Sequence, residues 1–116
     1  MEEKMTVQVS RFTTQTLRIS SWREGCEVGH AYLYIMTNDL HDAPFGLVED
    51  VFVEDQYRNQ GVGHELMIKL MSLSKQAGVY KLIATSRDDG TRQSVHDWYE
   101  RLGFKKYGVE FRIDIK

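Results

Sequence analysis

The stretch from Arg58 to Gly63 (Arg-Asn-Gln-Gly-Val-Gly) has the composition of an anion-binding turn. It follows the apolar run Val51 to Val53 and precedes a segment, Leu66 to Ala77, whose apolar residues recur with helical spacing. The first backbone N–H groups of a helix have no partners within the helix, and the helix dipole is positive there. Glycine adopts positive φ and lets an anion approach the backbone closely. The order of strand, glycine turn and helix therefore predicts a phosphate site.

Two common phosphate-binding patterns are excluded by the residues that follow the turn. A Walker loop would need Lys and then Ser or Thr after the last glycine, but Gly63 is followed by His64 and Glu65. A dinucleotide fingerprint would need a third small residue at the position of Leu66. An ordinary strand-to-helix connection stays an alternative for the turn taken alone.

A second block of residues lies further along the chain. The segment from His96 to Phe104 (His-Asp-Trp-Tyr-Glu-Arg-Leu-Gly-Phe) joins an aromatic pair, which includes Tyr99, to a Leu-Gly-Phe ending. The turn resembles the Arg/Gln-x-x-Gly-x-Gly/Ala motif of the GNAT superfamily of acetyl-CoA-dependent N-acetyltransferases, and this second block resembles the family's tyrosine helix. Glu49 to Val53 is similar to the strand that precedes the turn in many members. The resemblance covers about residues 45–116, with three motifs in the family's order.

The resemblance implies that the cosubstrate is acetyl-CoA and that no metal is needed. Backbone amides of the turn would hold the CoA pyrophosphate, and backbone groups of the preceding strand would bind the pantetheine arm and polarise the acetyl carbonyl. The side chains of that strand are expected to pack in the core. We expect further phosphate contacts from the guanidinium of Arg58, with Arg87 and Arg92 as additional candidates. The predicted cofactor-binding residues are Val51, Phe52, Val53, Arg58, Asn59, Gln60, Gly61, Val62, Gly63 and His64.

The resemblance also implies two catalytic groups for acetyl transfer. An amine with a pKa of about 10 is mostly protonated at neutral pH, so a base must take its proton. Glu49 stands where a carboxylate is the base in some family members, and a buried strand would raise its pKa. Asp50 and His96 are lesser candidates. Tyr99 occupies the position of the acid that protonates the departing CoA thiolate.

The elements that must position these residues follow from hydrophobic periodicity. Strands are predicted at 6–22, 27–37, 45–54, 81–85 and 109–116, and helices at 61–77 and 92–102. Both faces of the strand at 27–37 are largely apolar, so we expect it to be covered on both sides. The fold class is α/β (α+β), with a GNAT-like mixed, mostly antiparallel sheet covered by helices. A length of 116 residues supports a single domain over residues 1–116.

Composition limits the partners. The net charge of −2 gives no electrostatic reason to expect nucleic acid, and no apolar run reaches the length of about 20 residues that spans a membrane. The segment Met1 to Lys4 is not followed by the apolar stretch of a signal peptide, and Cys26 stands alone, so we expect a cytoplasmic protein.

The chain departs from the family before the turn. Members usually carry one or two helices between their first two strands, and no helical period precedes Gly61 here. The N-terminal helical region is therefore expected to be reduced or absent, which leaves the acceptor site open to a small-molecule or protein amine, or to closure in a homodimer. A CoA-binding regulatory or interaction module is the alternative function, and a phosphate-ligand protein of another kind is the third.

Overall fold

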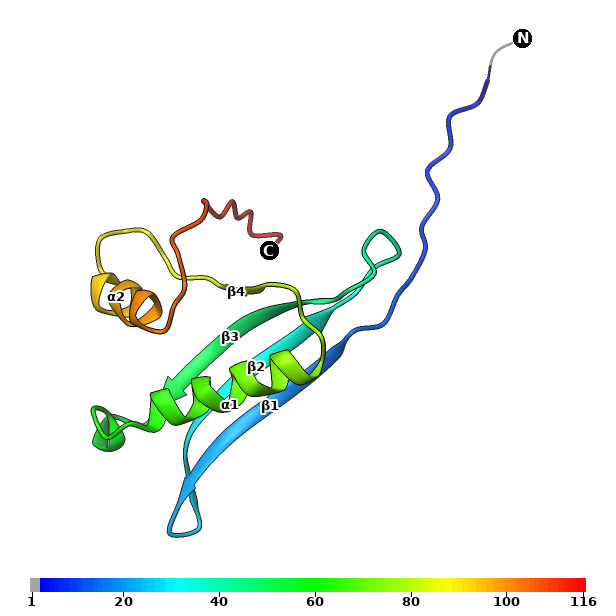
Figure 1. Cartoon of the computed structure of the whole chain (residues 1–116). Helices are drawn as coiled ribbons and strands as arrows, with labels where there is room; N and C mark the ends of the chain where they lie inside the picture. Colours follow the sequence, from blue (N-terminus) through cyan, green and yellow to red (C-terminus); the bar gives the residue numbers. More distant parts are fainter. Residues whose placement is uncertain (1–2) are drawn as a thin grey trace.

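The computed structural model describes residues 3–116. Its elements are β1 (Gln15–Arg23), β2 (Cys26–Met36), β3 (Phe45–Val53), the short 3-10 helix η1 (Asp55–Tyr57), α1 (Val62–Gln76), β4 (Leu82–Ala84) and α2 (Gln93–Arg101) (Figure 1). Both helices and the strands at 27–37, 45–54 and 81–85 are thereby confirmed, with no bound shifted by more than one residue.

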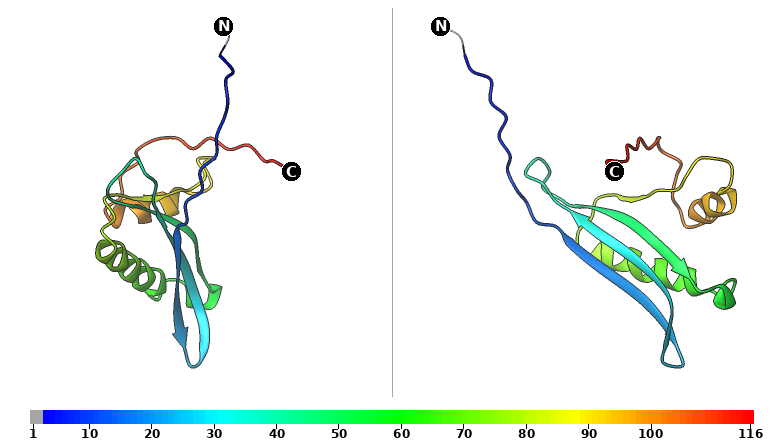
Figure 2. Two further views of the ribbon diagram at one scale, coloured as in Figure 1. Left: turned by 90° about the vertical axis from the view of Figure 1, so that its right-hand side faces the viewer. Right: turned by 180° about the vertical axis from the view of Figure 1, so that it is seen from behind.

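The four strands form one sheet in the order β1-β2-β3-β4. The first three strands run antiparallel, whereas β3 and β4 are parallel and are connected through α1. Helix α1 lies along one face of the sheet, and α2 lies beyond β3 on the side of β4 (Figures 1 and 2). The predicted mixed, mostly antiparallel sheet is confirmed.

The core lies between α1 and the face of the sheet that α1 covers. Leu33, Met67 and Leu70 are fully buried there, and β2 contributes every second residue to this layer. Gly29 permits the close approach of helix and sheet, because a Cβ atom at this position would lie 2.9 Å from Cγ1 of Val62 and 3.0 Å from the carbonyl oxygen of Phe52. The strand and the start of α1 are thus packed directly on each other at the position of the glycine turn.

The prediction that both faces of β2 are covered is wrong for the residues that the structure describes. His30, Tyr32 and Tyr34 point to the face opposite α1 and are only partly buried. Their aromatic character made the strand look two-sided, yet no described element lies over them (Figure 2).

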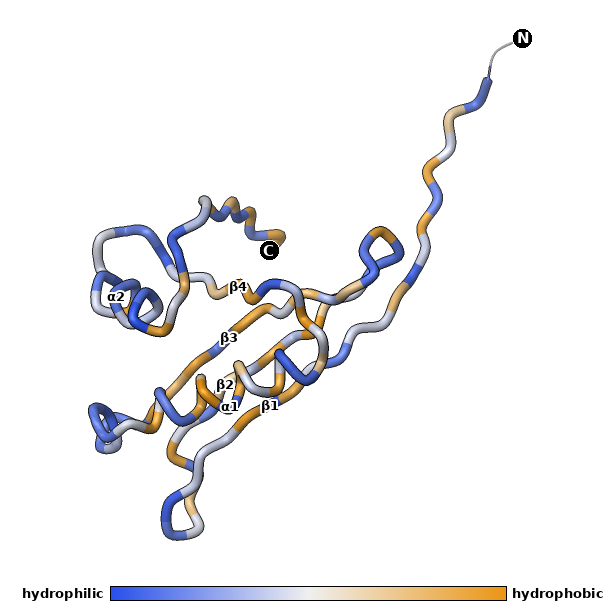
Figure 3. Tube along the Cα trace, in the orientation of Figure 1, coloured by the Kyte–Doolittle hydropathy of each residue, from blue (hydrophilic) through white to orange (hydrophobic). Residues whose placement is uncertain are grey.

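The predicted C-terminal strand is also absent. Residues 104–116 have no regular secondary structure, and four alternating apolar residues are 78–91% exposed, namely Val109, Phe111, Ile113 and Ile115. The first predicted strand begins only at Gln15, and residues 3–14 form an extended arm (Figure 1). Both segments alternate between apolar and polar residues (Figure 3). Alternation indicates which side of a strand is apolar, but a strand forms only when a neighbouring strand supplies its hydrogen bonds.

Candidate active site

The glycine turn presents unpaired backbone amides. Gly61 is the N-cap of α1 with φ of 82°, and Asn59 also has positive φ at 62°. The first amide of α1 with a backbone acceptor among the described residues is that of Glu65, which donates to the carbonyl of Gly61 at 3.0 Å. The amides of the preceding first turn, including those of Val62, Gly63 and His64, are therefore available to an anion.

The side chains of the turn serve mainly to hold it. The Nε of Arg58 donates to the carbonyl of Val53 at 3.2 Å, and its guanidinium pairs with Asp55 at 3.2 Å. The side-chain amide of Gln60 donates through Nε2 to the backbone carbonyl of Gln56 at 2.9 Å. Val62 is buried and His64 is exposed. Arg58 thus clamps the turn to the end of β3 and remains 59% exposed in its side chain.

The acidic residue in the first turn of α1 is neutralised by β1. Both carboxylate oxygens of Glu65 accept from Arg23 at 2.9 Å, and Ser21 donates to one of them at 3.3 Å. These bonds from Arg23 lower the pKa of the Glu65 carboxyl. The negative charge of Glu65 is therefore compensated close to the turn that would receive phosphate.

An opening lies between the two parallel strands. Strands β3 and β4 pair only from Gly46 with Leu82 to Val48 with Ala84, and the residues beyond these pairs separate. A cavity of about 530 Å³ lies at this point and extends to α2 and the C-terminal segment. Ligands of parallel sheets bind beyond the carboxyl ends of the strands, and this cavity has that location. Its lining includes Glu49, Asp50, Val51, Thr85, Ser86, Arg87, Arg92, Trp98, Tyr99, Glu110 and Arg112.

A β-bulge interrupts β3 at the same point. His30 pairs with Phe52 and Tyr32 pairs with Glu49, so Ala31 alone faces both Asp50 and Val51. Asp50 has φ of 51°, a conformation uncommon for a residue other than glycine. A bulge leaves the extra residue without ladder partners, so it exposes backbone groups to the cavity.

The two predicted catalytic residues line this one cavity. Burial raises the pKa of Glu49, and the nearby carboxylates of Asp50 and Glu110 add to the effect. Burial also raises the pKa of the Tyr99 hydroxyl, with Arg92 acting in the opposite direction and Glu49 reinforcing the rise. Glu49 is thus a stronger base than an ordinary carboxylate, and the raised pKa of Tyr99 favours its protonated form.

Polar groups without partners point to a missing ligand. The Oγ of Ser86 and the Nε of Arg92 are buried and have no hydrogen-bond partner among the described residues. Both residues line the cavity with Glu49 and Tyr99. Buried polar atoms normally have partners, so a ligand that supplies them would fit this site. Sequence reasoning missed Ser86, Glu110 and Arg112, although the position of Ser86 just after a strand is a signal that could have identified it.

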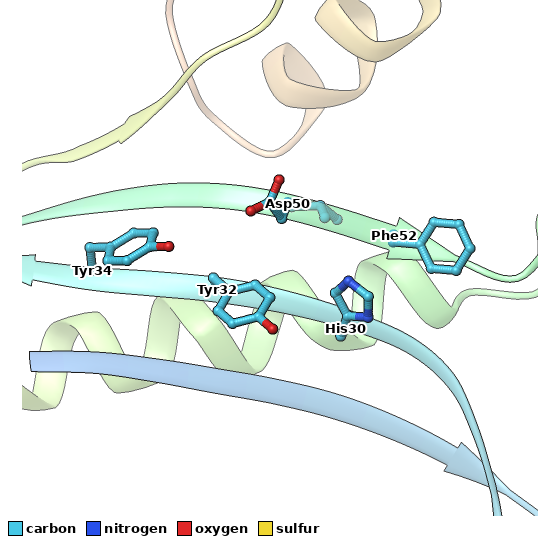
Figure 4. A pocket seen from close by; sticks show the side chains of 6 residues that line it. His30, Tyr32, Tyr34, Asp50 and Phe52 are labelled. Atoms are coloured by element: carbon cyan, nitrogen blue, oxygen red, sulfur yellow. The ribbon is translucent and has the colours of Figure 1, made fainter. Parts of the chain in front are cut away.

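A second, more open cavity adjoins the bulge on the face opposite α1. It is lined by His30, Tyr32, Tyr34, Asp50, Val51 and Phe52 and shares Asp50 and Val51 with the first cavity. Figure 4 shows the rings of His30, Tyr32 and Tyr34 in a row along β2, with Phe52 beside His30 and Asp50 on the neighbouring strand. The two cavities therefore meet at the bulge.

Two expectations for single residues are not met. Phe52 was expected to pack in the core, but its side chain is 42% exposed and lines the second cavity, whereas Val51 and Val53 do pack against the core. The extra residue of the bulge displaces the strand's alternation, and the side chain of Phe52 is consequently on the open face. His96, a lesser candidate base, contacts the carbonyl of Arg87 at 3.1 Å and lines neither cavity.

Residues 3–116 contain neither a candidate metal site nor a candidate membrane-spanning helix. No group of three or more His, Cys, Asp or Glu residues in this range could hold a metal ion. None of the helices in the same range has both the length and the apolarity required to cross a membrane.

Comparison with known proteins gives a family match. The model of the Acetyltransferase (GNAT) family matches residues 10–104. The glucosamine 6-phosphate N-acetyltransferase of Trypanosoma brucei brucei is 36% identical over 70 residues, which are 60% of this chain and 44% of that protein. Glucosamine 6-phosphate N-acetyltransferase 1 of Dictyostelium discoideum is 29% identical over 68 residues, 59% of this chain and 40% of that protein. The chain spans less than half the length of these curated relatives.

Solved structures agree with the predicted fold class. A crystal structure of a Trypanosoma brucei acetyltransferase superposes with a TM-score of 0.77 at 29% identity, over 86% of this chain and 69% of that one. The glucosamine-6-phosphate N-acetyltransferase of Arabidopsis thaliana superposes with a TM-score of 0.75 at 20% identity, over 87% of this chain and 67% of that one, a likeness that concerns the fold alone. The α+β fold with its mixed four-stranded sheet is confirmed, and no helix precedes β1 among the described residues.

Proposed function

The chain belongs to the GNAT family of acetyltransferases, and on that premise we propose that it transfers the acetyl group of acetyl-CoA to a primary amine. One observation carries the proposal. The glycine turn with free amides, the bulge and the Glu49–Tyr99 cavity all adjoin the carboxyl end of β3, with the turn after the strand and the bulge and Glu49 within its last five residues. Acetyl-CoA has a pyrophosphate, a pantetheine arm and a thioester in that order.

The proposed cofactor position matches each of these parts with a chemical group. The pyrophosphate would accept hydrogen bonds from the amides of Gly61 to His64, since a helix N-terminus favours anions. The pantetheine arm would lie between the separated ends of β3 and β4, beside Ser86 and Arg92. The thioester would reach the bulge, where a backbone N–H of Asp50 or Val51 can donate to its carbonyl oxygen.

The proposed reaction is a direct attack. Glu49, acting itself or through a water molecule, takes a proton from the amine, and the amine nitrogen forms a bond to the thioester carbon. The negative charge that develops on the carbonyl oxygen is stabilised by the bulge amide. The carbon–sulfur bond then breaks and the sulfur receives the proton of the Tyr99 hydroxyl. The nitrogen gives its remaining extra proton to the tyrosinate through water, Glu49 releases its proton to solvent, and the products are the N-acetylated amine and CoA.

The raised pKa values support these assignments. A carboxyl group whose pKa is raised is a stronger base when it is ionised, and burial together with Asp50 and Glu110 gives this property to Glu49. Tyr99 keeps its proton at neutral pH because burial raises its pKa. The CoA thiol has a pKa of about 8.5, so proton transfer from tyrosine is only modestly unfavourable.

A CoA-binding module without efficient catalysis is the second candidate function. The open face beside the bulge favours it, because no described element covers that face (Figure 2). Such a module would bind CoA with the turn and the cavity, but it would need neither the base Glu49 nor the acid Tyr99. Their common placement in one cavity favours the enzyme.

Assembly and location are also proposals. We propose a homodimer, because the apolar face of the C-terminal segment, Val109 to Ile115, is exposed far beyond what a single subunit needs. Sedimentation velocity would test it, and a monomer throughout the micromolar range would contradict it. We propose the cytoplasm as the compartment, because Cys26 is free and exposed.

The experiment that tests the function measures thiol release. The protein is mixed with acetyl-CoA and a panel of primary amines, and free CoA is followed with a thiol reagent. We expect release above the amine-free blank, with one acetylated amine for each CoA. Thermal stabilisation by CoA without turnover on any amine would support the binding module instead. The absence of both thermal stabilisation and turnover would contradict both candidates.

A further inference from the structure

The open cavity opposite α1 has a chemistry of its own. It has a volume of about 800 Å³, and four aromatic side chains form what we call the tyrosine wall, defined as His30, Tyr32, Tyr34 and Phe52. The ring of His30 lies 5.7 Å from that of Tyr32 and 5.5 Å from that of Phe52. The rings of Phe52, His30 and Tyr32 thus adjoin one another beside the bulge, and Tyr34 follows further along β2 (Figure 4).

The location of the strip suits the second substrate of a two-substrate reaction. The tyrosine wall and the Glu49–Tyr99 cavity both border β3 and share Asp50 and Val51. A thioester that reaches the bulge from the cavity between β3 and β4 would meet, at the same backbone, a molecule that rests on the wall. Glu49 pairs with Tyr32 in the β2–β3 ladder and borders this meeting point.

Arg18, a cation that contacts the wall, is already paired with a carboxylate. The guanidinium of Arg18 holds both carboxylate oxygens of Glu27, one of them at 2.9 Å, and its Nε donates to the Tyr32 hydroxyl at 3.0 Å. The carbon centre of the guanidinium also lies 5.7 Å from the centre of the Tyr32 ring. This fixed network holds Tyr32 in place and leaves Arg18 with little capacity for a ligand anion.

The carboxylates at the bulge, in contrast, are free. Neither Glu49 nor Asp50 takes part in an ion pair within residues 3–116. Arg87, Arg92 and Arg112 line the cavity between β3 and β4 but not the tyrosine wall. On the wall side, two unpaired carboxylates attract an ammonium group and repel a phosphate or carboxylate. The surface therefore combines negative charge at the reacting end with apolar rings along the rest.

We propose, on the basis of the function proposed above, that the tyrosine wall binds the acceptor and selects a primary amine on an apolar or aromatic body that has no anionic group. The amine would lie at Glu49 and Asp50, and the body of the molecule would stack on the rings of Tyr34, Tyr32 and His30. This specificity differs from that of the glucosamine 6-phosphate N-acetyltransferases among the relatives, whose substrate carries a phosphate.

The test compares three amines by kcat/KM in the thiol-release assay, namely phenethylamine, glucosamine and glucosamine 6-phosphate. The two sugars form a matched pair that differs only in the phosphate. We expect phenethylamine to be the best acceptor and glucosamine 6-phosphate the worst. Preference for glucosamine 6-phosphate over glucosamine would overturn the proposal and leave the acetyltransferase function intact. Absence of turnover with every amine would overturn both.

A set of variants tests the wall itself. Tyr34→Ala removes one ring, and we expect it to raise the KM for phenethylamine about 10-fold, the effect of losing one apolar contact of a ring. The affinity for CoA should stay unchanged. Tyr34→Phe keeps the ring and should restore the KM. Tyr80→Ala is the matched control, since Tyr80 is 50% exposed and lines neither cavity. Equal KM values in Tyr34→Ala and Tyr80→Ala would overturn the proposal.

Discussion

The role of the glycine turn predicts that two very similar substitutions will differ in CoA binding. Gly61 and Gly78 are at opposite ends of α1, with φ of 82° and 76°. A Cβ atom at either position would have nothing within 4 Å, so Gly61→Ala and Gly78→Ala introduce no clash. Each variant only places a side chain in the left-handed region, which costs about 1–2 kcal/mol.

The magnitudes follow from this geometry. For a chain of 116 residues, 1 kcal/mol corresponds to a shift in Tm of about 4 °C, so we expect both variants to lose about 4–8 °C. Alanine relieves its strain by moving φ, which turns the neighbouring N–H groups. At Gly61 these groups belong to the first turn of α1, and the loss of one hydrogen bond to a charged phosphate costs about 1.5–3 kcal/mol. The Kd for CoA should therefore rise about 10- to 150-fold in Gly61→Ala.

The assay is isothermal titration of each variant with CoA, together with thermal unfolding in its absence. Gly78→Ala should match Gly61→Ala in stability and match the unchanged protein in CoA affinity. Equal Kd values for CoA in the two variants would refute the placement of the pyrophosphate at the turn. A large loss of stability in only one variant would refute the strain argument.

Three further variants test the reaction and the core. Tyr99→Phe should lower kcat about 100-fold or more while the KM for acetyl-CoA changes little, and an unchanged kcat would remove Tyr99 from the mechanism. In the unchanged protein, activity should fall as the pH drops through the raised pKa of Glu49. Glu49→Gln should have a low kcat that no longer shows this pH dependence. Because the pKa of Glu49 is raised in the folded state, its contribution to stability is present below its unfolded pKa of about 4.3 and is lost as the pH rises through the folded value. The stability of Glu49→Gln relative to the unchanged protein should therefore be greater at about pH 8 than at about pH 4. The opposite trend in denaturant titrations would contradict burial as the cause of the raised pKa. Leu70→Ala should cost about 2–5 kcal/mol of unfolding free energy, because Leu70 is fully buried between α1 and the sheet, and a cost below about 1 kcal/mol would contradict that packing.

The sequence was sufficient for the elements that have a strong period and a clear end. Helix α1 has an apolar stripe and begins after Gly61, and β2 alternates over its whole length, so their bounds were predicted to within one or two residues. The glycine turn could be identified as well, because its function depends on backbone conformation that glycine makes possible.

Features that depend on a neighbour were not predictable. The C-terminal segment has the pattern of a strand, but the structure gives it no partner, and Glu110 and Arg112 line the cavity instead. The position of the bulge fixes which face Phe52 is on, and no local signal in the sequence locates that extra residue. Unpaired atoms such as the Oγ of Ser86 emerge only once burial is known.

The most direct measurement is a crystal structure of the protein with CoA bound. It should show pyrophosphate oxygens within about 2.7–3.2 Å of backbone nitrogens between Gly61 and His64. The sulfur should lie in the cavity between β3 and β4, within reach of the Tyr99 hydroxyl and beside the bulge at Asp50. A pyrophosphate bound elsewhere, or a sulfur on the far side of α1 from Tyr99, would contradict the proposed site.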